Sequence, residues 1–244
     1  MLFFQILALL GLIYGLLLWL VPKATNLHEI LRLPLYQYRV QKVSTRHMQV
    51  RRHSFGAHRR QYLLHCRPFP DQALQRNVII YYHGGGWAFG SPELFQANAQ
   101  FFVHLGFEVF LPSYRHLPGS HYPEMSIDSS LALQKVMELL PNPQFEHRQI
   151  ILSGMSAGGH LSALLFHDRQ RLQALGLEPQ QLFAGLLLFA APLDLRAMRD
   201  SLILRSLAGK RDRPLFRAAN PIEYLDRADS LPILCVHGNR DGLV

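Results

Sequence analysis

The chain has 244 residues, of which 49% are hydrophobic and 17% charged, so it can bury a sizeable core in one domain of about 200 residues. It contains no internal repeat or low-complexity segment, which argues against a repeat protein. Its formal net charge is +8. Cys66 and Cys235 are the only cysteines, and both fall in predicted apolar strands. The pattern therefore predicts two buried free thiols rather than a disulfide framework.

The first 21 residues are almost wholly apolar. A helix over residues 1–21 would rise about 1.5 Å per residue, so we expect a single-pass transmembrane anchor. A cleaved signal peptide is the alternative, but no basic segment precedes the apolar run, and residues 21–24 (VPKA) form a poor cleavage site. The expected location is therefore a membrane.

A basic segment follows the apolar run. Residues 22–70 hold ten Lys and Arg residues against Glu29 alone, a net charge of +9, which leaves the rest of the chain near neutrality. Such a block is expected to contact anionic membrane lipid and to place the body of the protein on the cytoplasmic side. A solvated basic face without a partner is an equally weighted alternative. These residues match no nucleic-acid-binding module, so we expect no nucleic-acid partner.

Residues 22–42 are interpreted as a juxtamembrane linker or a lid helix. Within them, residues 27–35 are predicted to form a short amphipathic helix that stops at Pro34.

From residue 43 onward, strand and helix patterns alternate. A hairpin is predicted from residues 43–52 and 61–66. Further strands are predicted at residues 77–82, 107–111, 150–152, 184–190 and 233–237, and helices at residues 92–104, 126–140 and 157–168. This order predicts an α/β fold with a mostly parallel sheet and helices on both faces. Residues 193–229 are too long for a plain connection and are interpreted as a cap over a pocket.

One short motif joins a predicted strand to a predicted helix. Residues 154–158 read GMSAG, a GxSxG pattern centred on Ser156. Such a nucleophile elbow is a strained turn that lifts the serine hydroxyl clear of the sheet, and its flanking glycines let strand and helix approach closely. A plain Gly/Ser turn is the alternative, which the rest of the chain makes improbable.

Three motifs, each after a predicted strand, carry a family resemblance. They are HGGGW at residues 83–87, GMSAGG at residues 154–159 and HGNRDGLV at residues 237–244. The stretch at residues 112–133 (PSYRHLPGSHYPEMSIDSSLAL) agrees with them. In these motifs the chain resembles α/β-hydrolase esterases of the hormone-sensitive-lipase-like group. The resemblance covers residues 43–244 and implies an α/β-hydrolase domain.

The resemblance implies a serine hydrolase of carboxylic esters, with a small-molecule ester as substrate and no cofactor or metal. Ser156 would be the nucleophile, and the backbone amide of Ala157 an oxyanion-hole donor. Gly85 and Gly86 would supply the other oxyanion-hole donors. Asp241 would be the catalytic acid, because it follows a strand in the chain order Ser, Asp, His.

Asp194 is the second choice for the acid, and either aspartate is also consistent with a plain turn residue. The resemblance places the histidine base a few tens of residues after Asp241, after one further helix and strand, whereas the sequence given ends at residue 244. His83, His160 and His237 are better interpreted as packing or local hydrogen-bonding residues. The domain is therefore expected to lack its C-terminal strand and helix, either because the sequence is a fragment of a longer protein or because the natural chain is truncated and catalytically impaired.

Three interpretations of function stay open on the sequence. The first is an ester hydrolase acting through an acyl-enzyme, and the second is an amidase or formamidase with the same mechanism. The third is a catalytically inactive hydrolase-fold protein that binds a partner.

Overall fold

The structure is a computed structural model that describes residues 2–22, 25–42, 46–140, 148–225, 230–239 and 241. The chain divides into two compact units, one of residues 44–237 and one of residues 1–43 together with 238–244.

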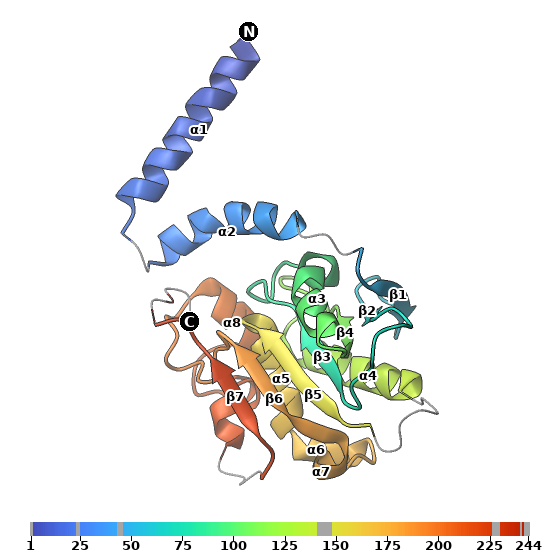
Figure 1. The fold of residues 1–244 in the computed structure, drawn as a ribbon. Coiled ribbons are helices and arrows are strands. Elements are labelled where there is room, and N and C mark those ends of the chain that lie inside the picture. The colour runs from blue at the N-terminus through green and yellow to red at the C-terminus, as the bar shows by residue number, and fades with distance from the viewer. Residues whose placement is uncertain are drawn as a thin grey trace. The chain divides into compact units, whose positions relative to one another are not determined.

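A seven-stranded sheet forms the centre of the larger unit, with the strand order β1-β2-β4-β3-β5-β6-β7 (Figure 1). β2 pairs antiparallel with β1 and with β4, and the other neighbours run parallel, which confirms the expected mostly parallel sheet. The strands are β1 Gln49–Ser54, β2 Tyr62–Arg67, β3 Val78–Tyr82, β4 Glu108–Pro112, β5 Ile150–Met155, β6 Phe183–Phe189 and β7 Ile233–Val236.

Helices cover both faces of this sheet, as expected (Figure 1). Alternate residues of a strand point to opposite faces, so Val78 and Ile80 of β3 enter one core while Ile79 and Tyr81 enter the other. The second core is closed by α3 (Gln96–His104), and the first by α4 (Tyr122–Leu139), α5 (Ala157–His167), α8 (Leu202–Ala208) and α9 (Pro214–Ala218). The shorter elements are η1 Pro92–Phe95, α6 Arg169–Ala174, α7 Pro179–Leu182 and η2 Pro221–Tyr224.

Two helix starts differ from the sequence predictions. The predicted helix at residues 92–104 is a 3₁₀ turn, η1, followed by α3. α4 begins at Tyr122, four residues before the predicted start. There the Glu124 carboxylate accepts a hydrogen bond from the His121 amide at 2.8 Å, and Pro123 occupies the first turn. Both features stabilise a helix N-terminus, so they extend α4 toward the preceding loop.

A buried ion-pair cluster surrounds Glu108 at the start of β4. The carboxylate is 2.5 Å from Arg67 Nε, 2.5 Å from Arg148 Nη1 and 3.4 Å from His65 Nε2. The Glu108 side chain is only 3% exposed. Burial by itself would raise the pKa of Glu108, but the contacts with His65 and Arg148 outweigh it and lower the pKa to about 2. The cluster therefore ties β2, β4 and the chain before β5 together by charge.

The smaller unit contains two helices, α1 Leu2–Leu20 and α2 Asn26–Gln41. Tyr14 donates a hydrogen bond from its hydroxyl to the Leu31 carbonyl, and the Thr25 side chain caps α2 at the His28 amide. α2 continues through Pro34, so the predicted helix end there is wrong. Pro34 removes one amide donor from the helix, and the residues on either side of it remain helical.

The prediction of a membrane anchor at residues 1–21 is corrected. Within the residues that the structure describes, no helix is both long enough and apolar enough to cross a membrane. α1 has 19 residues, which at about 1.5 Å per residue gives about 28 Å, slightly less than the roughly 30 Å of a bilayer's hydrocarbon core. The expected single-pass membrane location depended on that anchor and falls with it. The lipid contact expected of the basic segment has no support in the structure.

The last strand and the segment before it also bear on the sequence predictions. β7 ends the strand order, and all four of its residues are exposed, so Cys235 is exposed rather than buried as predicted, whereas Cys66 is buried.

The segment predicted to form a cap contains α8, α9 and η2 within residues 193–225, and Leu207 and Phe216 of this segment lie in the core beneath α4 and α5. The remaining residues of the predicted cap, 226–229, lie outside the described residues. The cap therefore stays a prediction.

Candidate active site

Ser156 occupies the turn between β5 and α5. Its backbone has φ 52° and ψ −122°, a strained conformation for a residue with a side chain. The turn is held on both sides, because the Ser156 amide donates to the Phe189 carbonyl at 2.9 Å and its own carbonyl accepts from the His160 amide at 2.9 Å. The Ser156 side chain makes no capping hydrogen bond to the helix. The strained backbone is thus fixed while the hydroxyl is left available.

Glycines let the strand and the helix meet closely beside this turn. A Cβ atom on Gly158 would lie 2.1 Å from the Tyr82 carbonyl oxygen, and one on Gly154 would lie 2.5 Å from the Gly158 carbonyl carbon. Real Cβ contacts are never that short, so β3, β5 and the first turn of α5 approach as only glycine permits. The close approach expected of the GxSxG motif is therefore present.

The loop at residues 83–90 lies against Ser156. A Cβ atom on Gly84 would be 3.0 Å from the Met155 carbonyl oxygen and 3.5 Å from Ser156 Cβ. Gly85 has φ 134°, and a Cβ there would lie 2.0 Å from the Phe89 carbonyl oxygen, so the loop requires glycine at this position. Gly85 in turn accepts backbone hydrogen bonds from Ala88 and Phe89 at 3.1 and 3.0 Å. These bonds close the loop into a rigid turn.

Three backbone amides near Ser156 are free of internal acceptors among the residues that the structure describes. Ala157 is the first residue of α5, so its amide has no acceptor within the helix. Gly85 and Gly86 lie in the adjoining loop, and their amides donate to no carbonyl in the described part of the chain. Free amides beside a strained serine have the chemistry of an oxyanion hole.

His83 opens this loop and serves as part of its frame. Its Nδ1 lies 2.8 Å from the Gly84 carbonyl oxygen, its carbonyl accepts a hydrogen bond from the Tyr114 hydroxyl at 3.0 Å, and its ring stacks on Tyr114. Burial lowers the pKa of His83 to about 4, so the ring is neutral at pH 7. The packing interpretation of His83 agrees with these contacts.

His160 lies one turn into α5, fully buried. Its Nδ1 is 3.2 Å from Trp87 Nε1, and its Nε2 is 2.7 Å from the Ala219 carbonyl oxygen. Both ring nitrogens are therefore engaged. The sequence indicated packing or local hydrogen bonding for His160 but did not reveal these partners, because Trp87 and Ala219 lie 73 and 59 residues away along the chain.

The two candidate acids stand in different surroundings. Asp194 is bound locally, since Arg196 donates to both carboxylate oxygens and Asn220 donates at 3.2 Å. The Arg196 hydrogen bond lowers the pKa of Asp194. Asp241 follows β7 in the chain, and its amide donates to the Gly238 carbonyl at 3.2 Å within the smaller unit.

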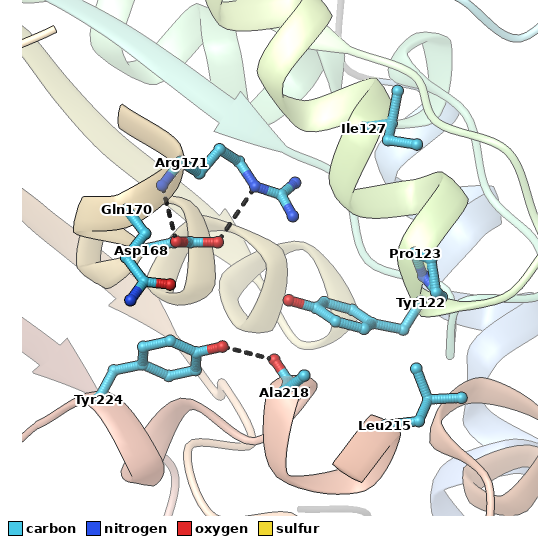
Figure 2. Close-up of a pocket in the computed structure, with 9 residues that line it drawn as sticks. All are labelled: Tyr122, Pro123, Ile127, Asp168, Gln170, Arg171, Leu215, Ala218 and Tyr224. Carbon is cyan, nitrogen blue, oxygen red and sulfur yellow. Dashed lines mark hydrogen bonds and ion pairs between the residues drawn. The ribbon is translucent and has the colours of Figure 1, made fainter. Parts of the chain in front are cut away.

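A cavity of about 340 Å³ lies near the end of α5 that is far from Ser156. Figure 2 shows the residues that line it. Asp168, directly after α5, accepts hydrogen bonds from the amide and Nε of Arg171, and the Tyr224 hydroxyl donates to the Ala218 carbonyl at 3.0 Å. From Ala157 to Asp168 the helix rises about 16 Å, so this cavity is separate from the serine. Most of the polar groups around it are satisfied by one another.

The mostly parallel sheet, the strained strand-to-helix serine turn and the adjoining glycine loop define an α/β-hydrolase fold, and the comparisons support its esterase group. The chain belongs to the BD-FAE family, whose model matches residues 69–244. At the level of the family, the likenesses support a hydrolase of the carboxylesterase and lipase type.

Two relatives and one solved structure illustrate the likeness. Neutral cholesterol ester hydrolase 1 of Rattus norvegicus is 33% identical over 103 residues, which cover 40% of this chain and 25% of that protein. Probable carboxylic ester hydrolase LipM of Mycobacterium tuberculosis is 27% identical over 192 residues, which cover 73% of this chain and 44% of that protein. Inhibited esterase B from Lactobacillus rhamnosis matches with a TM-score of 0.68 at 20% identity, over 82% of this chain and 69% of that one, which shows the shared fold.

Proposed function

We propose that this protein hydrolyses carboxylic esters through an acyl-enzyme formed on Ser156. The observation that carries the proposal is the Ser156 turn, where the backbone is strained at φ 52° and the hydroxyl makes no hydrogen bond to the helix. The turn lies beside a loop that requires glycine at position 85. Strain of this kind costs on the order of 1–3 kcal/mol and persists where surrounding structure enforces it, which is a feature of functional sites.

In the proposed reaction, Ser156 Oγ attacks the ester carbonyl carbon and gives its proton to a base. The carbonyl oxygen becomes an oxyanion, which accepts hydrogen bonds from the amides of Ala157, Gly85 and Gly86. The C–O bond to the alcohol then breaks, the alcohol leaves with the proton, and the acyl group stays on Ser156. Water attacks the acyl-enzyme in the same way and releases the carboxylic acid and the free serine.

The acid and the base follow the chain order Ser, Asp, His. We assign the acid to Asp241, because it follows β7 in that order, and keep Asp194, whose carboxylate accepts hydrogen bonds from Arg196 and Asn220, as the second choice. The base would be a histidine after Asp241 in that order. His160 is unsuited to the role, because its two ring nitrogens are bound to Trp87 and Ala219.

The test compares the full chain with the Ser156→Ala variant in hydrolysis of p-nitrophenyl butyrate. Loss of the nucleophile is expected to lower kcat by roughly a thousandfold or more. Ser54→Ala, an exposed serine at the end of β1, is the matched control and should keep the wild-type rate. A fluorophosphonate probe should label Ser156 in the wild type and the control but not in Ser156→Ala. Asp241→Asn should lower kcat far more than Asp194→Asn does.

Other outcomes point to the other interpretations. Faster cleavage of the matching butyryl p-nitroanilide than of the ester would indicate an amidase. Equal rates and equal labelling in the wild type and Ser156→Ala would refute the serine assignment. The same result together with tight binding of an ester would indicate a hydrolase-fold binding protein.

A further inference from the structure

Trp87 ends the glycine loop in a conformation that needs external support. It has φ 60°, directly after Gly86 at φ 55°, and a bulky residue rarely adopts positive φ without a cost on the order of 1–3 kcal/mol. The indole is 3% exposed, and the Trp87 carbonyl accepts a hydrogen bond from the Leu117 amide at 3.0 Å. The side chain and the backbone of Trp87 are therefore both anchored.

The anchor of the indole is His160, and the chemistry of the two groups fixes the tautomer. An indole nitrogen can only donate, so His160 Nδ1, at 3.2 Å, must be the acceptor and carries no proton. The ring proton then sits on Nε2, which donates to the Ala219 carbonyl oxygen at 2.7 Å. The two rings meet edge to face with centroids 5.2 Å apart. Burial lowers the pKa of His160 to about 4, which is consistent with this neutral form.

The three partners come from three parts of the fold. Trp87 belongs to the glycine loop, His160 to the helix that begins beside Ser156, and Ala219 to the turn after α9. His160 N also donates to the Ser156 carbonyl at 2.9 Å. The His160 side chain thus connects the loop to the turn after α9, and its backbone amide connects both to the serine turn.

We propose that His160 is a positioning residue, which holds the Gly85 and Gly86 amides in place through Trp87 and ties that loop to the turn at Ala219. The proposal rests on the proposed ester hydrolysis for its catalytic consequence. His160 contacts no substrate in this role and accepts no proton from Ser156. Its effect reaches the reaction through the placement of oxyanion donors.

The kinetic test uses Trp87→Phe and His160→Leu with p-nitrophenyl butyrate. Trp87→Phe removes the indole N–H and keeps an aromatic ring, whereas His160→Leu removes both hydrogen bonds. Oxyanion donors act in the transition state, so each variant should lower kcat by about tenfold or more while KM stays within about twofold. The double variant should lose little more than the worse single variant, because the two residues share one contact.

Two matched controls separate positioning from general damage. Trp19→Phe changes the other tryptophan of the chain, which is 79% exposed, and His167→Leu makes the same substitution seven residues further along α5 at a buried histidine. Both should keep the wild-type kcat. A merely structural role for His160 would lower the melting temperature without this split between kcat and KM, and an equal kcat loss in His167→Leu would overturn the proposal.

A second measurement is independent of activity. In ¹H–¹⁵N NMR spectra, His160→Leu should shift the Trp87 indole N–H signal and the backbone amide signals of Gly85 and Gly86, while His167→Leu leaves them in place. If the wild type hydrolyses the ester no faster than Ser156→Ala does, the proposed function fails and these amide signals alone decide the positioning claim. Unmoved Gly85 and Gly86 amides, or an unchanged kcat in a folded Trp87→Phe, would overturn it. Should His160→Leu fail to fold, Trp87→Phe carries the kinetic measurement, and the Gly85 amide signal, two residues from the substitution, carries the NMR measurement.

Discussion

Substituting Glu108 by glutamine should destabilise the protein at neutral pH and flatten its response to acid. The carboxylate is 3% exposed and lies 2.5 Å from each of two guanidinium groups. A pKa lowered from 4.5 to about 2 corresponds to about 3 kcal/mol of folding free energy, at about 1.4 kcal/mol for each pKa unit. Glu108→Gln keeps the shape of the side chain but removes the negative charge that lies 2.5 Å from Arg148 Nη1, at a guanidinium that is 4% exposed.

The pH window follows from the sign of the change. A carboxyl group whose folded pKa is depressed contributes stability above its unfolded pKa, near 4.5, and loses it as the pH falls toward about 2. The wild type should therefore exceed Glu108→Gln by about 3 kcal/mol in the free energy of unfolding at pH 7, and the difference should shrink between pH 4.5 and pH 2. Urea unfolding followed by circular dichroism at several pH values measures this difference.

The control is Glu138→Gln, which removes the carboxylate of the exposed Lys135–Glu138 pair in α4. The Glu138 side chain is 63% exposed, so this change should cost less than about 1 kcal/mol. A Glu108→Gln penalty below about 1 kcal/mol at pH 7 would refute the reasoning. A penalty that stays constant from pH 7 to pH 2 would refute it as well, because it would then come from packing rather than charge.

Two further predictions concern the elbow and the thiols. Gly158→Ala should abolish activity and lower the yield of folded protein, because the new Cβ would lie 2.1 Å from the Tyr82 carbonyl oxygen. Wild-type kinetics in this variant would contradict the close approach of strand and helix. In a protein of residues 1–244, Cys235 should react with a thiol reagent such as Ellman's in the native state. Cys66, which is buried and has its pKa raised to about 12, should react only on unfolding, and two fast thiols would contradict the structure.

Local patterns predicted much of the fold, because apolar periodicity and turn residues act over a few positions. The apolar run at residues 77–82 predicted β3, and the GMSAGG motif predicted the turn between β5 and α5. The acidic residue and the proline at the start of α4 are visible in the sequence, although the helix was predicted to begin four residues too late. The predicted elbow strand stopped too early, because Ser153 and Gly154 can be buried inside a sheet when neighbouring strands satisfy their backbone.

The sequence predictions failed or were incomplete where a residue's surroundings depend on contacts with residues far away in the sequence. Cys235 sits in an apolar strand, but its exposure depends on the place of β7 at the end of the strand order, which periodicity does not encode. Glu108 and Arg148 are 40 positions apart, and His160 finds Trp87 and Ala219 only through the packing of three elements. In the candidate site, motifs predicted the serine and its glycine neighbours, while the side chain that holds the loop became apparent only in three dimensions.

The strained backbone of Ser156 sets stability against reactivity at a single position. Glycine would adopt φ 52° at little cost, so a selection for thermostability alone would favour replacing Ser156, the proposed nucleophile. Only a selection that also demands catalysis would keep a side chain there. Engineers who stabilise this scaffold should therefore exclude the elbow from consensus or glycine-to-alanine schemes and look for gains on the outer faces of α3 and α4.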